Sequence, residues 1–213
     1  QTVEHVMAAL AGMGVDDACV EVDGPEAPLL DGSALEFARL LGQVGLKEQG
    51  VESPWPRLAR PVYYEEGDAV LVALPASGFT LHYTFTSDHP ALGCQYAQFS
   101  IGPEEGPQSF GPRFLREIAP ARTVGWLHEV EALRRRGLAL GASMDSAVVV
   151  DEERLLTPLR LPHEVARHKV LDLMGDLFLV GRFQARVVAL RTGHRHHVAF
   201  ARALAASGAV ITC

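Results

Sequence analysis

The feature that most constrains the fold is a predicted helix over residues 164–180 that is apolar nearly all round. Four of its polar side chains recur at every fourth position: Glu164, His168, Asp172 and Asp176. Because a helix turns about 100° per residue, these four side chains share one arc about 120° wide. A solvated stripe with i,i+4 ion pairs is the ordinary explanation of such a pattern. The almost continuous apolar surface favours a buried helix instead, whose polar stripe faces a cleft or a partner.

Two residues of this stripe have the spacing of metal ligands. His168 and Asp172 stand four residues apart, so an imidazole and a carboxylate on one helix face can bind the same ion. His163 and His168 resemble the zinc-protease motif H-E-x-x-H, but they are separated by one residue too many. Five residues turn a helix by about 500°, which leaves the two imidazoles about 140° apart. His163 is therefore expected to be an ordinary residue at the start of the helix.

Further histidines lie near both ends of the chain. Glu4 and His5 are adjacent on a predicted helix, where a surface carboxylate and a packed histidine explain them without any chemistry. His194, His196 and His197 follow an apolar predicted strand over residues 183–191. The buried end of that strand would deliver His194 into a cleft, where a histidine near carboxylates is a candidate general acid. Chelation by the three histidines and a solvent-facing loop stay open as alternatives.

The remaining pattern predicts two modules and an α+β fold. Residues 53–56 read Ser-Pro-Trp-Pro, which blocks both a helix and a central strand, so we place a domain boundary there. Residues 1–56 form the first module, with a helix over 2–12, a strand over 18–22 and a helix from about 35. Residues 57–213 form the second, with strands over 62–65, 69–74, 79–86, 96–101, 147–151 and 183–191 and helices over 127–136, 164–180 and 198–206. The elements do not alternate strictly, which indicates α+β rather than a doubly wound parallel sheet.

Composition excludes several classes of function. Lys and Arg number 19 against 26 Asp and Glu, a net charge of −7, so the basic field that nucleic acids and anionic membranes attract is missing. No run is long and apolar enough for a membrane helix, and the start lacks a signal peptide. Cys19, Cys94 and Cys213 suit no disulfide framework, which favours a reducing compartment. The phosphate-binding and nucleophile-elbow glycine motifs are absent.

The chain starts without Met inside a helical pattern, so we expect it to be a fragment of a longer chain.

Seven short motifs occur in an order that is typical of one family. They are Thr2-Val3-Glu4-His5, Asp31-Gly32-Ser33-Ala34, Asp88-His89-Pro90, Ala121-Arg122-Thr123, His168-Lys169-Val170-Leu171-Asp172, Gly175-Asp176 and Gly193-His194. The chain resembles the UDP-3-O-acyl-N-acetylglucosamine deacetylases, zinc enzymes of the committed step of lipid A biosynthesis, from Thr2 to about Phe200. The resemblance implies two α+β modules packed helix layer to helix layer in a β-α-α-β sandwich. The first module is expected to be incomplete, because the family begins upstream of T-V-E-H.

The resemblance also implies a zinc site and a reaction. The expected Zn²⁺ ligands are His5, His168 and Asp172, three protein groups that leave a position for water, as catalytic zinc sites do. The expected reaction is hydrolysis of the acetamide of UDP-3-O-acyl-N-acetylglucosamine, with release of acetate. The implied setting is the cytoplasm of a Gram-negative bacterium, with a small-molecule substrate and no nucleic-acid partner.

The family's other site residues map onto five positions. Glu4 corresponds to the general base that takes the proton of water, and Thr123 to the donor that stabilises the oxyanion. His194 corresponds to the histidine that stabilises charge or protonates the leaving amine, and Asp176 to the carboxylate that orients it. Lys169 corresponds to a lysine that contacts substrate.

Two departures from the family pattern keep other hypotheses open. Val124 stands where the family usually has an aromatic residue, and Arg195-His196-His197-Val198 replaces A-L-N-N. A degenerate or truncated relative that binds metal or ligand without turnover would fit these changes. An unrelated metal hydrolase would use His196 and His197 as ligands.

Overall fold

The computed structural model describes residues 3–51, 55–102, 105, 107–128 and 145–211. The helices are α1 (Glu4–Met13), α2 (Leu35–Val44), α3 (Pro107–Glu117), α5 (Glu164–Leu177, continued by a 3-10 turn over Phe178–Val180) and α6 (His194–Ala206). The main sheet contains β2 (Val62–Glu66), β3 (Ala69–Leu74), β4 (Phe79–Thr86), β5 (Cys94–Ile101) and β8 (Ala185–Leu190). Four short strands form two pairs, β1 (Arg57–Leu58) with β9 (Val210–Ile211) and β6 (Val124–Trp126) with β7 (Val148–Val150).

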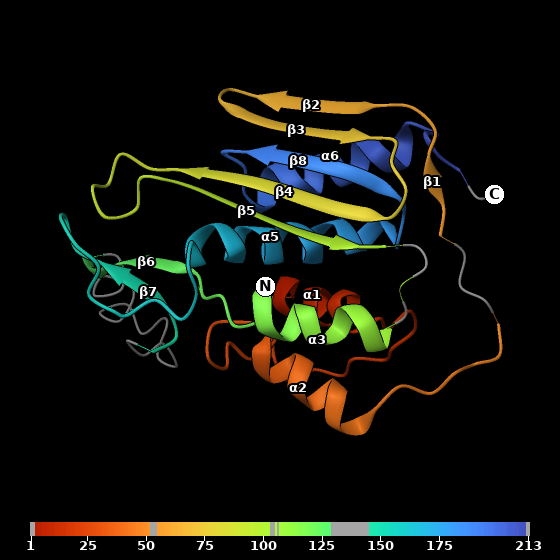
Figure 1. The fold of residues 1–213 in the computed structure, drawn as a ribbon, viewed down its shortest axis with the longest axis horizontal. Coiled ribbons are helices and arrows are strands. Elements are labelled where there is room, and N and C mark those ends of the chain that lie inside the picture. Colours follow the sequence, from red (N-terminus) through yellow and green to blue (C-terminus); the bar gives the residue numbers. More distant parts are fainter. Residues whose placement is uncertain (1–2, 52–54, 103–104, 106, 129–144, 212–213) are drawn as a thin grey trace.

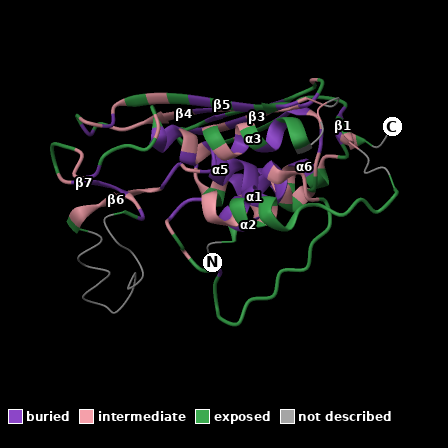
Figure 2. Cartoon of the chain, turned by 60° about the horizontal axis from the view of Figure 1, so that its bottom comes forward, coloured by how far each residue is buried: buried purple, intermediate pink, exposed green. Residues whose placement is uncertain are grey.

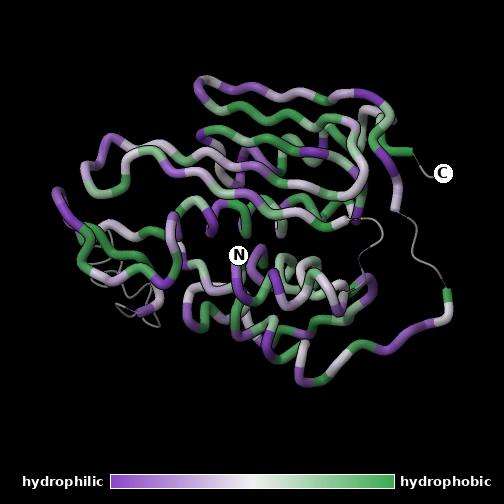
Figure 3. Tube along the Cα trace, in the orientation of Figure 1, coloured by the Kyte–Doolittle hydropathy of each residue, from purple (hydrophilic) through white to green (hydrophobic). Residues whose placement is uncertain are grey.

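The main sheet has the order β2-β3-β8-β4-β5, with β8 parallel to β4 and antiparallel to β3. One face is covered, since α5 packs on β4 and β5 while α6 packs on β2 and β3. Burial alternates along β8, where Ala185, Val187 and Ala189 are buried and the residues between them are exposed. Strands β3 and β8 are hydrophobic along most of their length (Figure 3). Both the period of two and the hydrophobicity fit a sheet that buries one face.

Helix α5 lies in the middle of the molecule, between the sheet and α1 (Figure 1). It is almost wholly buried, whereas the outer sides of α2 and α3 are largely exposed (Figure 2). The predicted burial of the long helix is thus confirmed, and so is the α+β class. One core cluster joins Ala8 and Ala38 to Leu171 and Met174, and so includes residues from both predicted modules. The boundary at residue 56, and the second sheet that a β-α-α-β sandwich requires, stay predictions.

Most predicted elements are present, and the differences have physical causes. The strand predicted over 18–22 is wrong: these residues are exposed, and none pairs with another strand in the part of the chain that the structure describes. Helix α6 begins at His194 rather than 198. Sequence reasoning missed α3, whose Gly111 and Pro112 interrupt the helical pattern, although Phe110 and Phe114 are buried four residues apart. Most of the helix predicted over 127–136 lies outside the described residues.

A glycine sets how closely α1 crosses α5. A Cβ placed on Gly175 would lie 2.1 Å from the backbone oxygen of Glu4, far inside contact distance. Only a residue without a side chain lets the first turn of α1 rest on α5 at this point. This contact places Glu4 and His5 over the polar stripe of α5.

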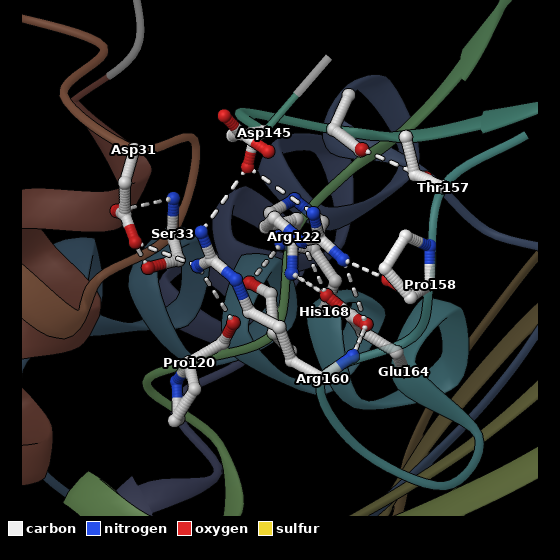
Figure 4. Close-up of polar contacts among 12 residues, drawn as sticks. Asp31, Ser33, Pro120, Arg122, Asp145, Thr157, Pro158, Arg160, Glu164 and His168 are labelled. Carbon is white, nitrogen blue, oxygen red and sulfur yellow. Dashed lines mark hydrogen bonds and ion pairs between the residues drawn. The ribbon is translucent and has the colours of Figure 1, made fainter. Parts of the chain in front are cut away.

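A buried ion pair fixes the other end of α5. Glu164 is fully buried, and its carboxylate accepts hydrogen bonds from the backbone N of Arg122 (3.0 Å), from Nε of Arg122 (2.8 Å) and from the backbone N of Arg160 (2.6 Å). The guanidinium of Arg122 also donates to the carbonyls of Asp145 and Pro158. Figure 4 shows these side chains converging beside the first turn of α5.

The same network reaches the loop before α2. Nη1 of Arg160 donates to Oδ2 of Asp31 at 2.6 Å, and Oγ of Ser33 donates to Oδ1 of Asp31 at 2.7 Å (Figure 4). A Cβ on Gly32 would lie 1.8 Å from the backbone oxygen of Ser146, so this loop also needs a glycine for its close approach. The Asp-Gly-Ser motif thus holds the start of α2 against the segment that precedes α5.

We predict that Gly175→Ala destabilises the fold by about 1–3 kcal/mol, because the added methyl group must push α1 away from α5. Urea unfolding measures the change in the free energy of unfolding. Gly42→Ala in α2 is the matched control: its nearest atom is Cε of Met13 at 3.6 Å, an ordinary contact. Helix propensity should make that variant as stable as the parent or slightly more stable. Equal stability of the parent and Gly175→Ala would contradict the close crossing.

We also predict that Glu164→Gln costs about 3–5 kcal/mol, because it leaves the buried guanidinium of Arg122 without its counter-charge. The matched control is Glu36→Gln, which breaks the exposed pair of Arg39 and Glu36 (2.6 Å). That change should cost at most about 1 kcal/mol, since water replaces an exposed partner. Similar losses for both variants in chemical denaturation would refute the special role of the buried pair.

Candidate metal centre and active site

Two helices bring together the three residues expected to bind metal. His168 and Asp172 lie one turn apart on α5, and His5 comes from the first turn of α1. Their possible ligand atoms all lie within 4.8 Å of one another. Nε2 of His168 is 3.2 Å and Nε2 of His5 is 3.9 Å from Oδ1 of Asp172. All three side chains are buried, so the group forms a compact polar cluster inside the helix layers.

Both imidazoles of the cluster present Nε2 to the carboxylate. Nδ1 of His168 donates to the backbone oxygen of Ala121 at 2.9 Å, which leaves Nε2 without a proton in the neutral ring. Metal-bound histidines commonly have such a bond on the second nitrogen. Burial, and next the neighbouring His168, lower the pKa of His5 to about 4. His5 is therefore neutral at neutral pH, the form in which imidazole binds a metal.

The carboxylate of Asp172 is ionised and has one free oxygen. Burial alone would raise the pKa of Asp172, but attraction to His168 and to the Lys169 ammonium holds it well below its usual range. Oδ2 accepts a hydrogen bond from Nζ of Lys169 at 2.8 Å. Oδ1 is buried and accepts no hydrogen bond from any described residue. Such an atom is costly unless a partner is supplied. The two imidazoles and this oxygen form a donor set that fits Zn²⁺.

A second cluster lies one turn further along α5. Oδ2 of Asp176 accepts from Nδ1 of His194 at 2.8 Å and from Nδ1 of His197 at 2.7 Å. The hydrogen bond with Asp176 is the main cause that raises the pKa of His194 to about 9. His194 is therefore protonated at neutral pH, and its Nε2 lies 3.8 Å from Oδ2 of Asp172. A proton donor thus faces the cluster of His5, His168 and Asp172.

The other expected site residues lie around these clusters. Glu4 begins α1, directly before His5, and its negative charge contributes to the raised pKa of His194. Thr123 follows Arg122, two residues after the carbonyl that accepts from His168, and its own carbonyl accepts from the backbone N of Val148. The catalytic roles of Glu4 and Thr123 stay predictions.

An open cavity of about 370 Å³ lies beside Lys169. Its lining combines two cations and one carboxylate with hydroxyl groups and aromatic rings: Tyr83, Phe85, Thr86, Ser87, Asp88, Lys169, Arg191 and Thr192. Nε of Arg191 donates to Oγ1 of Thr86 at 2.7 Å, and Nζ of Lys169 is held by Asp172. The cavity can therefore admit a polar ligand next to the clustered histidines.

The structure also places the residues that sequence reasoning kept out of the metal site. Glu164 belongs to the polar stripe and pairs with Arg122, away from the cluster of His5, His168 and Asp172. His163 is exposed at the start of α5. His196 and His197 do not converge on one ion, since Nδ1 of His196 accepts from the backbone N of Gly193 while His197 turns to Asp176. The contact of His197 with Asp176 carries no signal in the sequence, because it depends on where α6 begins.

The chain is similar to known proteins over nearly its whole length. The family model described as UDP-3-O-acyl N-acetylglycosamine deacetylase matches residues 1–206. A UDP-3-O-acyl-N-acetylglucosamine deacetylase of Nostoc sp. is 42% identical over 210 residues, which cover 97% of this chain and 73% of the relative. The enzyme of the same name from Nitratidesulfovibrio vulgaris is 43% identical over 206 residues, 95% of this chain and 64% of the relative. That from Myxococcus xanthus is 42% identical over 196 residues, 91% of this chain and 60% of the relative.

The chain therefore spans about 60–73% of the length of these relatives. None of the helices in the described residues has the length and hydrophobicity needed to cross a membrane. The family match covers nearly the whole chain, including both histidine clusters. The chain belongs to the UDP-3-O-acyl-N-acetylglucosamine deacetylase family.

Proposed function

We propose that the chain is a zinc-dependent amidohydrolase that cleaves the acetamide of UDP-3-O-acyl-N-acetylglucosamine and releases acetate, the committed step of lipid A biosynthesis. The observation that carries the proposal is the buried cluster of His5, His168 and Asp172. In this cluster, Oδ1 of Asp172 accepts no hydrogen bond from a described residue. The names of the relatives supply the substrate. Because the relatives are longer than this chain, the proposal concerns the activity of the whole protein.

The three clustered residues would hold the metal, and the groups around them would handle protons. Zinc, when bound, lowers the pKa of a water molecule and polarises a carbonyl group. The carboxylate of Glu4, next to the ligand His5, accepts the proton that the attacking water loses. The hydroxyl of Thr123 donates to the oxyanion that develops on the former amide carbon.

His194 supplies a proton to the leaving amine. Its raised pKa of about 9 means that it holds this proton at neutral pH, and Nδ1 is oriented by Asp176. An amine leaves far more readily after protonation, so a positioned acid is needed to complete amide hydrolysis. Glu4 at the start of α1 thus performs the base step, and His194 at the start of α6 performs the acid step.

Lys169 and the adjacent cavity bind the substrate in this proposal. Lys169 and Arg191 supply two positive charges against the single carboxylate of Asp88, and Thr86 and Ser87 supply hydroxyls, which suits a ligand that carries phosphate groups. A small UDP-sugar is a suitable occupant, whereas the net charge of −7 disfavours nucleic acid. The cytoplasm of a Gram-negative bacterium, inferred from the family resemblance, is part of the same proposal.

We predict that Glu4→Ala retains about one zinc per chain and loses at least about 100-fold in kcat, because it removes the base but no ligand. Zinc is measured by elemental analysis, and turnover by release of acetate from the UDP-acyl sugar. Unchanged turnover would remove Glu4 from the mechanism.

We predict that His168→Ala, by contrast, loses zinc together with activity, because two protein ligands do not retain the ion. His196→Ala is the control and should keep its zinc. The opposite pattern would support the unrelated hydrolase that uses His196 and His197. Zinc binding without turnover, in the whole protein as well as in this chain, would favour a relative that binds but does not catalyse.

A further inference from the structure

A chain of buried hydrogen bonds runs from the sheet to His194. The hydroxyl of Tyr83 on β4 donates to the carbonyl of Thr192, and Oγ1 of Thr192 lies 2.9 Å from Nε2 of His197. Nδ1 of His197 lies 2.7 Å from Oδ2 of Asp176, the oxygen that Nδ1 of His194 also contacts at 2.8 Å. One carboxylate oxygen therefore serves two histidines.

The direction of each hydrogen bond follows from the chemistry of the groups. Burial alone would raise the pKa of Asp176, but the hydrogen bonds with His194 and His197 lower it, so the group is a carboxylate and can only accept. Nδ1 must then carry the proton in both rings. Burial lowers the pKa of His197, so its ring is neutral and Nε2 accepts from the hydroxyl of Thr192.

The two histidines differ in how firmly they are held. His197 is 0% exposed, and both of its ring nitrogens form hydrogen bonds. Its ring packs edge-on against that of Tyr83, with 6.4 Å between the ring centroids. The side chain of His194 is 49% exposed, and its Nδ1 bonds to the oxygen of Asp176 that His197 already contacts. A fixed, buried donor thus restrains the carboxylate that in turn orients a half-exposed ring.

We propose that His197 is a positioning residue, whose buried Nδ1–H fixes the carboxylate of Asp176 so that the shared oxygen directs Nε2 of His194 toward the metal-binding cluster. The proposal rests on the proposed function, because it assigns to His194 a proton-transfer role that needs a fixed orientation. It concerns one of the positions at which this chain departs from the family pattern. A displacement of about 1 Å at such a group can cost a large factor in rate.

A second metal ion is the competing explanation of this cluster. The ligand atoms of Asp176, His194 and His197 lie within 4.8 Å of one another. An ion bound there would have to displace the proton that each Nδ1 donates to Asp176. His197 would then lose its hydrogen bond with Asp176. Hydrogen bonding accounts for every polar atom of His197 without an ion.

Two substitutions at one position test the proposal. His197→Phe keeps a ring against Tyr83 but removes both nitrogens, whereas His197→Asn keeps one N–H donor and one acceptor. We expect His197→Phe to lower kcat at least about 10-fold with little change in KM and with zinc content unchanged. His197→Asn should recover part of the loss. His82→Phe is the matched control, because His82 bonds to the hydroxyl of Tyr96, away from the clusters, and should leave kcat unchanged.

Nitrogen-15 NMR of the histidine rings in the zinc-loaded protein gives a readout that does not depend on turnover. We expect protonated Nδ1 signals for both His194 and His197 in the parent protein, and loss of the protected Nδ1–H signal of His194 in His197→Phe. A parent protein in which Nδ1 of His197 carries no proton overturns the proposal, even if His197→Phe fails to fold.

The remaining outcomes are also decisive. Unchanged kcat and an intact His194 signal in His197→Phe would overturn the positioning role. Two zinc ions in the parent and one in the variant would make His197 a ligand and would equally overturn it. Absence of deacetylation by the whole protein would instead refute the proposed function, and the NMR signals would still decide whether His197 orients His194.

Discussion

The approach of α1 to α5 at Gly175 is the constraint on which the rest of the site depends. The backbone oxygen of Glu4 occupies the space that any side chain at this position would fill. Because Glu4 and His5 are adjacent in the first turn of α1, one contact places both residues over the stripe of α5. The position of His5 relative to His168 and Asp172 is therefore a packing result, and the chemistry follows from it.

Helix α5 uses buried charge in two opposite ways. At its start, the carboxylate of Glu164 is saturated by donors from Arg122 and Arg160, an arrangement that offsets the cost of burial with hydrogen bonds. Two turns later, Asp172 keeps Oδ1 without a hydrogen bond from any described residue, although it is equally deep. The first arrangement fixes the fold and the second leaves a position for a ligand. The two sites are linked through His168, which lies between them on α5 and donates to the backbone oxygen of Ala121, the residue before Arg122.

What the sequence could predict depended on distance along the chain. His168 and Asp172 were linked by helical periodicity alone, because four residues fix their relative direction. His5 and Glu4 entered only through the family resemblance, since no periodic rule relates two separate helices. The strand predicted over 18–22 failed because alternation shows only that a segment can pair and not that a partner exists. Helix α3 was missed because Gly111 and Pro112 hide its apolar spacing, and the turn of His197 toward Asp176 required the start of α6 to be known.

The order of strands in the main sheet has a consequence for how the protein is made. The pairs β2–β3 and β4–β5 are formed by neighbouring segments, but they are joined only by β8, which lies between β3 and β4 and is synthesised much later. Until residues 185–190 leave the ribosome, each pair has an open edge that can recruit another chain. Helix α5 comes just before this strand, so its burial against a complete sheet also waits for that step. The cluster of His5, His168 and Asp172 is thus completed only after α5 has been synthesised, and α5 packs on a joined sheet only after β8 has followed it.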